Sequence, residues 1–285
     1  MKPLAKPRRG RAPGFGRWTL RIFTGLVLFF LMLPLTIVFP ISVSSALYLE
    51  FPPPGFSWQW YARYLGDPDW IDATVRSLEI GAATVVLSLL VGVPLSFSLV
   101  RGSYPGKTAI DRLMTTPMIV PTIVTSIAIY GIFSTLRLIG EWYGIAIAHT
   151  LLALPFVVIL VGAGLRGLDP NLEQAALGLG ATRFTAIRRV TLPQIRPSLI
   201  SAALIAFITS FDELVVAMFL AGSRMTLPKK MFDNIRMEID PTIAAVSVLQ
   251  ILLIAAVLLI SARFGRDAED LAIRIAGTPR KRPGA

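Results

Sequence analysis

The chain has 285 residues, of which 54% are apolar and only 16% charged, yet its net charge is +11. A basic domain that binds nucleic acid would instead be rich in charge and ordinary in apolar content, so nucleic acid is not an expected partner. The absence of Cys excludes a disulfide scaffold and thiolate chemistry, and the single His149 excludes a multi-histidine metal centre. An all-α integral membrane protein without a metal site is the class that this composition predicts.

Six segments are long and apolar enough to cross a bilayer, which takes about 20 residues each. Several contain proline, such as Pro117 and Pro155, which membrane helices tolerate because neighbouring helices can satisfy the freed backbone groups. In chain order the predicted spans are residues 22–47, 75–100, 113–136, 144–165, 198–221 and 242–262.

The basic residues are distributed unevenly between the segments that these spans separate. Six spans place the basic tail 1–21, two of the loops and the tail 263–285 on one side, and that side holds 21 of the 28 Lys and Arg residues. Because loops rich in Lys and Arg stay in the cytoplasm, both termini are predicted to be cytoplasmic.

The segment 48–73, predicted to face the opposite side, is rich in aromatic residues. Amphipathic rings favour the headgroup level, so the pattern predicts a short interfacial helix. An aromatic box for a ligand is the alternative interpretation. The residues concerned are Trp58, Trp60, Tyr61, Tyr64 and Trp70.

The cytoplasmic loop 166–197 contains the pattern of two short helices. Asp169 or Asn171 can cap the first helix, and Gly178 and Gly180 can end it. A second helix is predicted over 182–190. Two interpretations remain open on these grounds: a docking surface for another protein, or an amphipathic loop lying on the headgroups.

The same loop resembles the motif of the inner-membrane permeases of binding-protein-dependent ABC importers (type I). That motif is Glu-Ala-Ala, three residues, Gly, nine residues, then Ile or Val, any residue and Leu-Pro. One position departs from it, since Gln stands where the family usually has Glu, and the neighbouring Glu173 lies about 100° around a helix from that position. The matching residues are Gln174, Ala175, Ala176, Gly180, Val190, Leu192 and Pro193.

The resemblance covers about residues 50–262, and the stretches SFDELVVAMFLAGSRMTLPKKMF and DPTIAAVSVLQILL are most like the spermidine/putrescine subgroup. It implies the type I permease fold, with a module over 74–262 after the first span, in the bacterial inner membrane. It also implies half of a translocation pathway for a small cationic or amine-bearing solute. Opine, aminobutyrate or phosphonate permeases are alternatives within the class.

The resemblance further implies a set of partners and the residues that meet them. Residues 173–180 would form a coupling helix that docks on a dimeric cytoplasmic ATPase, with Pro193 in a structural role. A second permease subunit, in a heterodimer, and a periplasmic solute-binding protein would complete the importer. The sequence has no G-x-x-x-x-G-K-[ST] phosphate loop, so ATP and Mg²⁺ are expected on the ATPase, and this chain is expected to bind no cofactor and to have no catalytic residues.

Two adjacent carboxylates, Asp212 and Glu213, lie within the predicted fifth span. Ionisable groups at membrane depth are costly and usually mark a pathway, a site or an ion pair. Facing a translocation pathway, they would suit a cationic substrate; the alternative is pairing with Arg76 or Arg137. His149 is predicted to be packed and hydrogen-bonded between helices. A secondary transporter is a remote alternative, because span-embedded charge is concentrated in one helix rather than spread over several.

Overall fold

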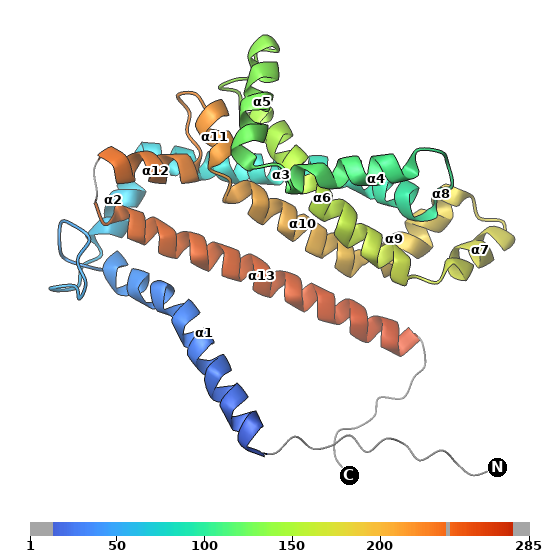
Figure 1. Ribbon diagram of the computed structural model, residues 1–285, viewed down its shortest axis with the longest axis horizontal. Coiled ribbons are helices and arrows are strands. Elements are labelled where there is room, and N and C mark those ends of the chain that lie inside the picture. The colour runs from blue at the N-terminus through green and yellow to red at the C-terminus, as the bar shows by residue number, and fades with distance from the viewer. Residues whose placement is uncertain (1–13, 238–239, 276–285) are drawn as a thin grey trace. The chain divides into compact units, whose positions relative to one another are not determined.

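A computed structural model describes residues 14–237 and 240–275, and the regular elements within those ranges are helices (Figure 1). The chain divides into two compact units, one comprising the residues up to Arg63 with Asp240–Val248, the other Tyr64–Ile239 with the residues from Leu249 onward. Among the described residues, four helices are long and apolar enough to cross a membrane. The count rises to six if each of two bent pairs is one span, namely Lys107–Met118 with Thr122–Thr135 and Arg183–Gln194 with Arg196–Phe211.

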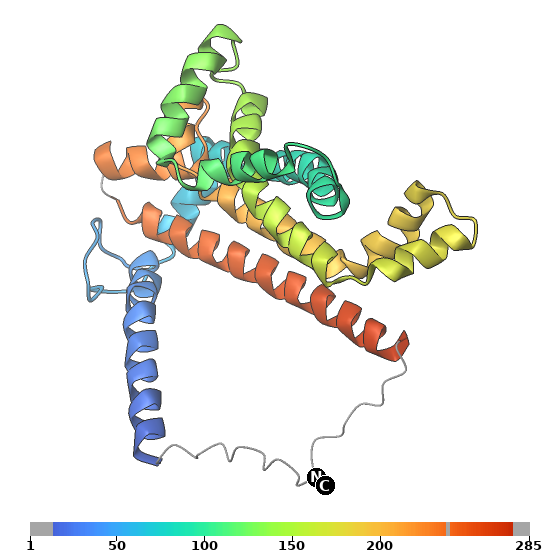
Figure 2. The ribbon, with the colours of Figure 1, turned by 45° about the vertical axis from the view of Figure 1, so that its right-hand side comes forward.

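The second unit is built on three long helices that lie side by side: α3 (Pro68–Arg101), α6 (Trp142–Gly167) and α10 (Arg196–Phe211) (Figures 1 and 2). Asp67 caps α3 by accepting a hydrogen bond from the Asp69 amide, and Pro68 occupies the first turn. Thr84 Oγ1 donates to Ala146 O and Ser96 Oγ to Val158 O, each at 3.4 Å, so α3 and α6 run in the same direction.

A stripe of small residues on α3 lets α6 and α10 approach it closely. In lipid, helices associate through close packing rather than through the hydrophobic effect, which favours small residues at the interface. A Cβ atom built on Gly92 would lie only 2.6 Å from Val157 Cγ1 of α6. The buried small residues of the stripe are Ala73, Ser77, Gly81, Thr84, Ser88, Gly92 and Ser96.

Gly92→Val is therefore expected to destabilise the second unit by about 1–3 kcal/mol, because added side-chain volume in a packed interior forces the helices apart. Gly131→Val in α5 is the matched control, since a Cβ atom there meets nothing within 4 Å. Thermal unfolding in one detergent would measure the difference. Equal melting temperatures for the two variants would contradict the packing role of Gly92.

Two predicted spans are broken rather than continuous, which corrects their expected course. Residues 113–136 fall on α4 (Lys107–Thr115), the 3-10 turn η1 (Thr116–Met118) and α5 (Thr122–Thr135), with a bend of 105°. Pro117 and Pro121 lack the amide protons that a continuous helix needs there. Residues 198–221 fall on α10 and α11 (Val215–Leu220), interrupted at 212–214.

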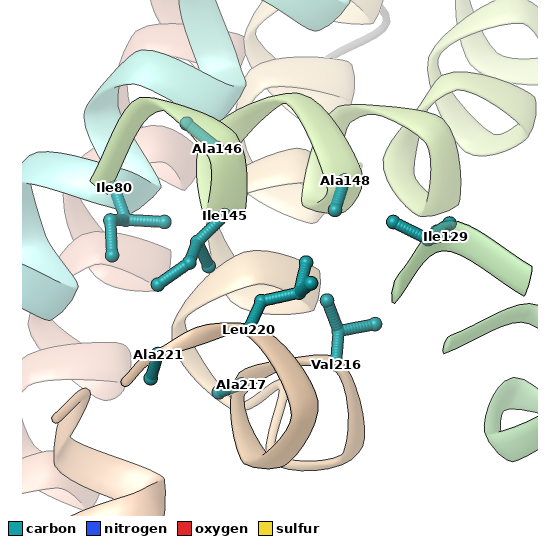
Figure 3. Packing of buried hydrophobic residues seen from close by; sticks show 9 residues of the cluster. All are labelled: Ile80, Ile129, Ile145, Ala146, Ala148, Val216, Ala217, Leu220 and Ala221. Carbon is teal, nitrogen blue, oxygen red and sulfur yellow. The ribbon is translucent and has the colours of Figure 1, made fainter. Parts of the chain in front are cut away.

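The helices α5, α6 and α11 share a hydrophobic cluster at one end of the second unit, to which α3 contributes Ile80 (Figure 3). Leu220 and Val216 of α11 point between α6 and α5 in this view. Tyr130 of α5 and Phe219 of α11 add an edge-on ring contact with centroids 6.4 Å apart. The remaining cluster residues are Ile129, Ile145, Ala146, Ala148, Ala217 and Ala221.

The first unit contains α1 (Gly14–Ser42) and the start of α2 (Gln59–Gly66). Trp60 Nε1 donates to Ser44 O at 2.8 Å, and the Ser42 and Tyr61 hydroxyls lie 2.9 Å apart. Arg63 pairs with Asp240 at 3.4 Å. These contacts fasten the segment that follows α1 to α2 and to the residues before α13 (Thr242–Ile275), which begins in the first unit and continues in the second.

Three of the five aromatic residues that are predicted to lie at the headgroup level are packed inside the protein. Trp60 is only 3% exposed and Trp70 only 2%, and Tyr64 is buried, whereas Trp58 is 72% exposed. Tyr64 packs against Trp70 in the second unit, and its hydroxyl lies 2.8 Å from that of Thr74. These polar partners within the chain let the rings be buried, a geometry that composition does not reveal.

The first and the last helix extend into the segments that are predicted to be tails. The first helix begins at Gly14, inside the predicted tail 1–21, and α13 continues to Ile275, inside the predicted tail 263–285. The rest of each predicted tail, residues 1–13 and 276–285, lies outside the described residues.

Candidate functional site

The segment between α6 and α10 projects from one end of the second unit, at the end opposite α12 (Leu227–Met237) (Figures 1 and 2). It consists of α7 (Pro170–Gly178), α8 (Arg183–Ala186), the π-helical turn η2 (Ile187–Thr191) and α9 (Leu192–Gln194). We call residues 169–195 the projecting segment. Asp169 Oδ1 accepts from the Asn171 amide at 3.0 Å, so of the two predicted capping residues it is Asp169 that caps α7.

The turn after α7 requires the glycine at position 180. Gly180 has φ +88°, its amide donates to Leu177 O, and the Ala181 amide donates to Ala176 O. This pair of bonds is the Schellman arrangement, which places a left-handed residue directly after the helix cap. The turn reverses the chain toward α8, where Thr182 Oγ1 accepts from the Thr185 amide at 3.2 Å.

The projecting segment presents apolar side chains on its surface. Leu179 is 90% exposed and Phe184 is 73% exposed. Gln174, Ala175 and Gly180 of the predicted coupling motif are exposed too, while Glu173 and Ala176 are half-buried. An exposed surface with large apolar side chains is typical of a protein–protein contact.

The base of the projecting segment is packed into the three-helix core. Ile195 and Leu165 are both buried in the cluster that joins α3, α6 and α10, and Leu192 packs against it. The predicted motif residues therefore occupy two settings. Glu173 to Gly180 lie on α7 and its turn, and Val190, Leu192 and Pro193 lie on η2 and α9, with α7 packed against η2.

The second candidate site is the interruption between α10 and α11. Asp212 is exposed, whereas Glu213 Oε1 accepts from the Val216 amide at 3.0 Å and so caps α11. Among the ion pairs between described residues none includes either carboxylate, so the alternative pairing with Arg76 or Arg137 is not observed. The two adjacent carboxylates thus have different surroundings in the structure, although the sequence predicts the same role for both.

A buried polar trio holds the end of α10 in place. Ser210 Oγ lies 2.8 Å from His149 Nδ1 and 3.1 Å from Thr84 Oγ1, and His149 is only 1% exposed. The prediction that His149 is packed and hydrogen-bonded between helices is confirmed. The trio joins α3, α6 and α10 two residues before Asp212, and its members could not be paired from the sequence because they lie more than 60 positions apart.

Two of the cavities lined by described residues of the second unit bear on these elements. One, of about 340 Å³, is almost entirely apolar and lies between the α4–α5 bend and α6, where it includes Thr116, Pro117 and Pro155. The other, of about 470 Å³, lies between the first turns of α3 and the segment around α12. Charged groups of both signs line it: Asp69, Asp72, Arg76, Glu79, Arg224 and Lys230.

Comparison with known proteins places the chain in a family. Residues 84–270 match the family model described as "Binding-protein-dependent transport system inner membrane component". The chain is 29% identical over 208 residues to the spermidine/putrescine permease protein PotC of Haemophilus influenzae, a match that covers 73% of this chain and 81% of PotC. It is 32% identical over 203 residues to the putrescine permease protein PotI of Escherichia coli, covering 68% and 72%.

Two further comparisons extend the match along the chain. The sulfate permease protein CysT of Salmonella typhimurium is 30% identical over 285 residues, covering 92% of this chain and 98% of CysT. A crystal structure of a bacterial ABC transporter that imports alginate has the same fold, with TM-score 0.70 at 18% identity over 91% of this chain and 99% of that one. The predicted resemblance, polyamine-like subgroup included, is confirmed: the chain belongs to the family of inner-membrane permease components of binding-protein-dependent ABC importers.

Proposed function

We propose that this chain forms half of the pathway of an ATP-driven importer for small amine-bearing solutes, with putrescine or spermidine as the substrate class. The observation that carries the choice of substrate is Asp212, an exposed carboxylate at a break between two helices that forms no ion pair with another described residue. Helix interruptions at membrane depth are where transporters bind charged substrates, and the C-terminal end of a helix favours cations. The similarity to PotC and PotI supports the same class.

The projecting segment is the proposed docking site for a cytoplasmic ATPase. Its exposed Leu179 and Phe184 would be covered by that partner, while its buried base would transmit the partner's movement to α6 and α10. ATP and Mg²⁺ would then be bound by the ATPase, and this chain would be non-catalytic. A second permease subunit and a periplasmic solute-binding protein complete the proposed assembly.

The proposed topology has six spans, with the bent pair α4 and α5 as the third and α10 with α11 as the fifth, and with both termini in the cytoplasm. The supporting observation is the excess of Lys and Arg in the tails and in the segments after α3 and α6. In this orientation the projecting segment faces the cytoplasm, and the mixed-charge cavity beside α12 faces the periplasm.

A second candidate substrate class is a small anion such as sulfate. Its support is the match to CysT, which covers more of this chain than the matches to PotC and PotI do. Opines, aminobutyrate and phosphonates, which carry an acidic group, are further candidates of the same importer class.

Uptake of radiolabelled putrescine, spermidine and sulfate should be compared in host cells with and without this chain, the other subunits being present in both. We expect uptake of one or both amines to depend on the chain and to be competed by unlabelled amine but not by sulfate. Uptake of sulfate alone would contradict the amine assignment and support the second candidate.

A further inference from the structure

Arg101, the last residue of α3, reaches across to the end of another helix. Its Nη2 donates to Leu165 O and to Leu168 O, both at 3.2 Å, over sequence separations of 64 and 67 residues. Leu165 is in the last turn of α6, and Leu168 immediately precedes Asp169, the cap of α7. A single guanidinium nitrogen therefore spans the α6–α7 junction.

These two hydrogen bonds satisfy backbone carbonyls at the end of α6 and not at the end of α3. The last turn of α3 has its own cap, because the Gly102 amide donates to Ser98 O at 2.9 Å. The junction after α6 instead leaves the helix through Leu168 in an extended conformation, without the glycine turn that satisfies the end of α7. Unpaired carbonyls at a helix end favour a cation, both as hydrogen-bond acceptors and through the helix dipole.

The placement of Arg101 is costly unless it serves this contact. The side chain is half-buried, and among the described residues its Nε has no hydrogen-bond partner and no carboxylate pairs with it. Burying part of a cation without a counter-charge opposes folding, so its attachment to two carbonyls is what stabilises it there.

We propose that Arg101 is a positioning residue for energy coupling, because it ties α3 to the α6–α7 junction, where the projecting segment begins. Packing already joins α3 to α6 and α10 along their lengths. The Arg101 guanidinium adds a polar attachment of α3 at the α6–α7 junction, where a movement of α7 would enter the three helices. This inference rests on the proposed docking of an ATPase on α7, but the tie itself can be measured without the ATPase.

The first experiment measures the tie in the full-length chain in lipid nanodiscs. Because the chain has no Cys, spin labels can be attached to Val86→Cys on the exposed face of α3 and Asn171→Cys on α7 without background. Arg101→Met is expected to broaden the label–label distance distribution. Arg166→Met is the matched control: it removes an exposed cation from the last turn of α6 and should leave the distribution narrow.

The magnitude follows from the bonds lost. Removing two hydrogen bonds from a charged donor is expected to raise, roughly tenfold or more, the population of molecules in which α3 is detached from the α6–α7 junction. Arg101→Lys keeps the charge on a shorter side chain and should give a distance distribution of intermediate width. If Arg101→Met fails to insert in the membrane, the width measured for Arg101→Lys tests the proposal. Distributions as narrow as wild type for both Arg101 variants would overturn the proposal.

The second experiment uses the assembled transporter in proteoliposomes and measures ATP hydrolysed per solute imported. A merely structural defect lowers hydrolysis and import together and leaves their ratio unchanged. Loss of the tie should raise the ratio for Arg101→Met, less for Arg101→Lys and not for Arg166→Met. An unchanged ratio would overturn the coupling role, whereas a wild-type assembly that imports nothing would count against the proposed function and leave the spin-label result standing.

Discussion

Gly180→Glu is expected to abolish solute import while the chain still inserts in the membrane. Gly180 has φ +88°, a conformation that costs a residue with a Cβ atom roughly 1–2 kcal/mol, and it lies beside the exposed Leu179. Glutamate adds this strain and also places a charge on an apolar surface that we propose docks on the ATPase. Import and receptor-stimulated ATP hydrolysis in proteoliposomes would measure the effect.

A series at this position separates strain from charge. Gly180→Asn should import at near the wild-type rate, since asparagine tolerates the left-handed conformation, and Gly180→Ala should be intermediate. Gly178→Ala, at a helical position where a Cβ atom meets nothing, is the control. Wild-type import by Gly180→Glu, at matched expression, would remove the turn after α7 from the coupling surface.

Asp212→Asn is expected to lower the rate of amine import about tenfold or more. Two unit charges 4 Å apart interact by about 4 kcal/mol at the effective dielectric of a protein surface, and desolvation offsets part of this. The initial rate of uptake as a function of putrescine concentration is the measurement. Asp212→Glu should retain substantial activity, and Asp111→Asn in α4, also an exposed aspartate, is the charge-matched control.

The neighbouring carboxylate should behave differently, although the sequence suggests the same role for both. Glu213→Gln keeps an oxygen that can accept from the Val216 amide, so it should cost little, whereas Glu213→Ala removes the cap of α11 and about 1 kcal/mol of stability. A tenfold loss of import in Glu213→Gln together with full activity of Asp212→Asn would contradict this separation of roles.

The features that could be predicted are those encoded by neighbouring residues. Asp169 before α7 and Gly180 after it form hydrogen bonds to residues two and three positions away, so capping rules locate the helix in the sequence. The apolar lengths of α1, α3, α6 and α13 are likewise local properties. The family motif added the expected partners, which no spacing rule provides.

The features that could not be predicted depend on distant partners. The acceptors of Arg101 lie at least 64 residues away. In the sequence, a basic residue at the end of a span indicates only on which side of the membrane that end lies. The burial of Trp60 and Tyr64 could not be predicted for the same reason, because their hydrogen-bond partners belong to other parts of the chain. The small-residue stripe of α3, repeating mostly every fourth position, was visible in the sequence and would have marked the face that packs against other helices, α6 and α10 among them.

That stripe also determines how the sequence can vary. Ser77, Thr84 and Ser88 are polar and Gly92 is not, yet all occupy the same buried face, so it is the size of the side chain that is restricted there and not its polarity. Substitutions should drift freely among Gly, Ala, Ser and Thr at positions that make no hydrogen bond to another helix. A larger aliphatic residue, conservative by hydrophobicity, should be the change that evolution avoids.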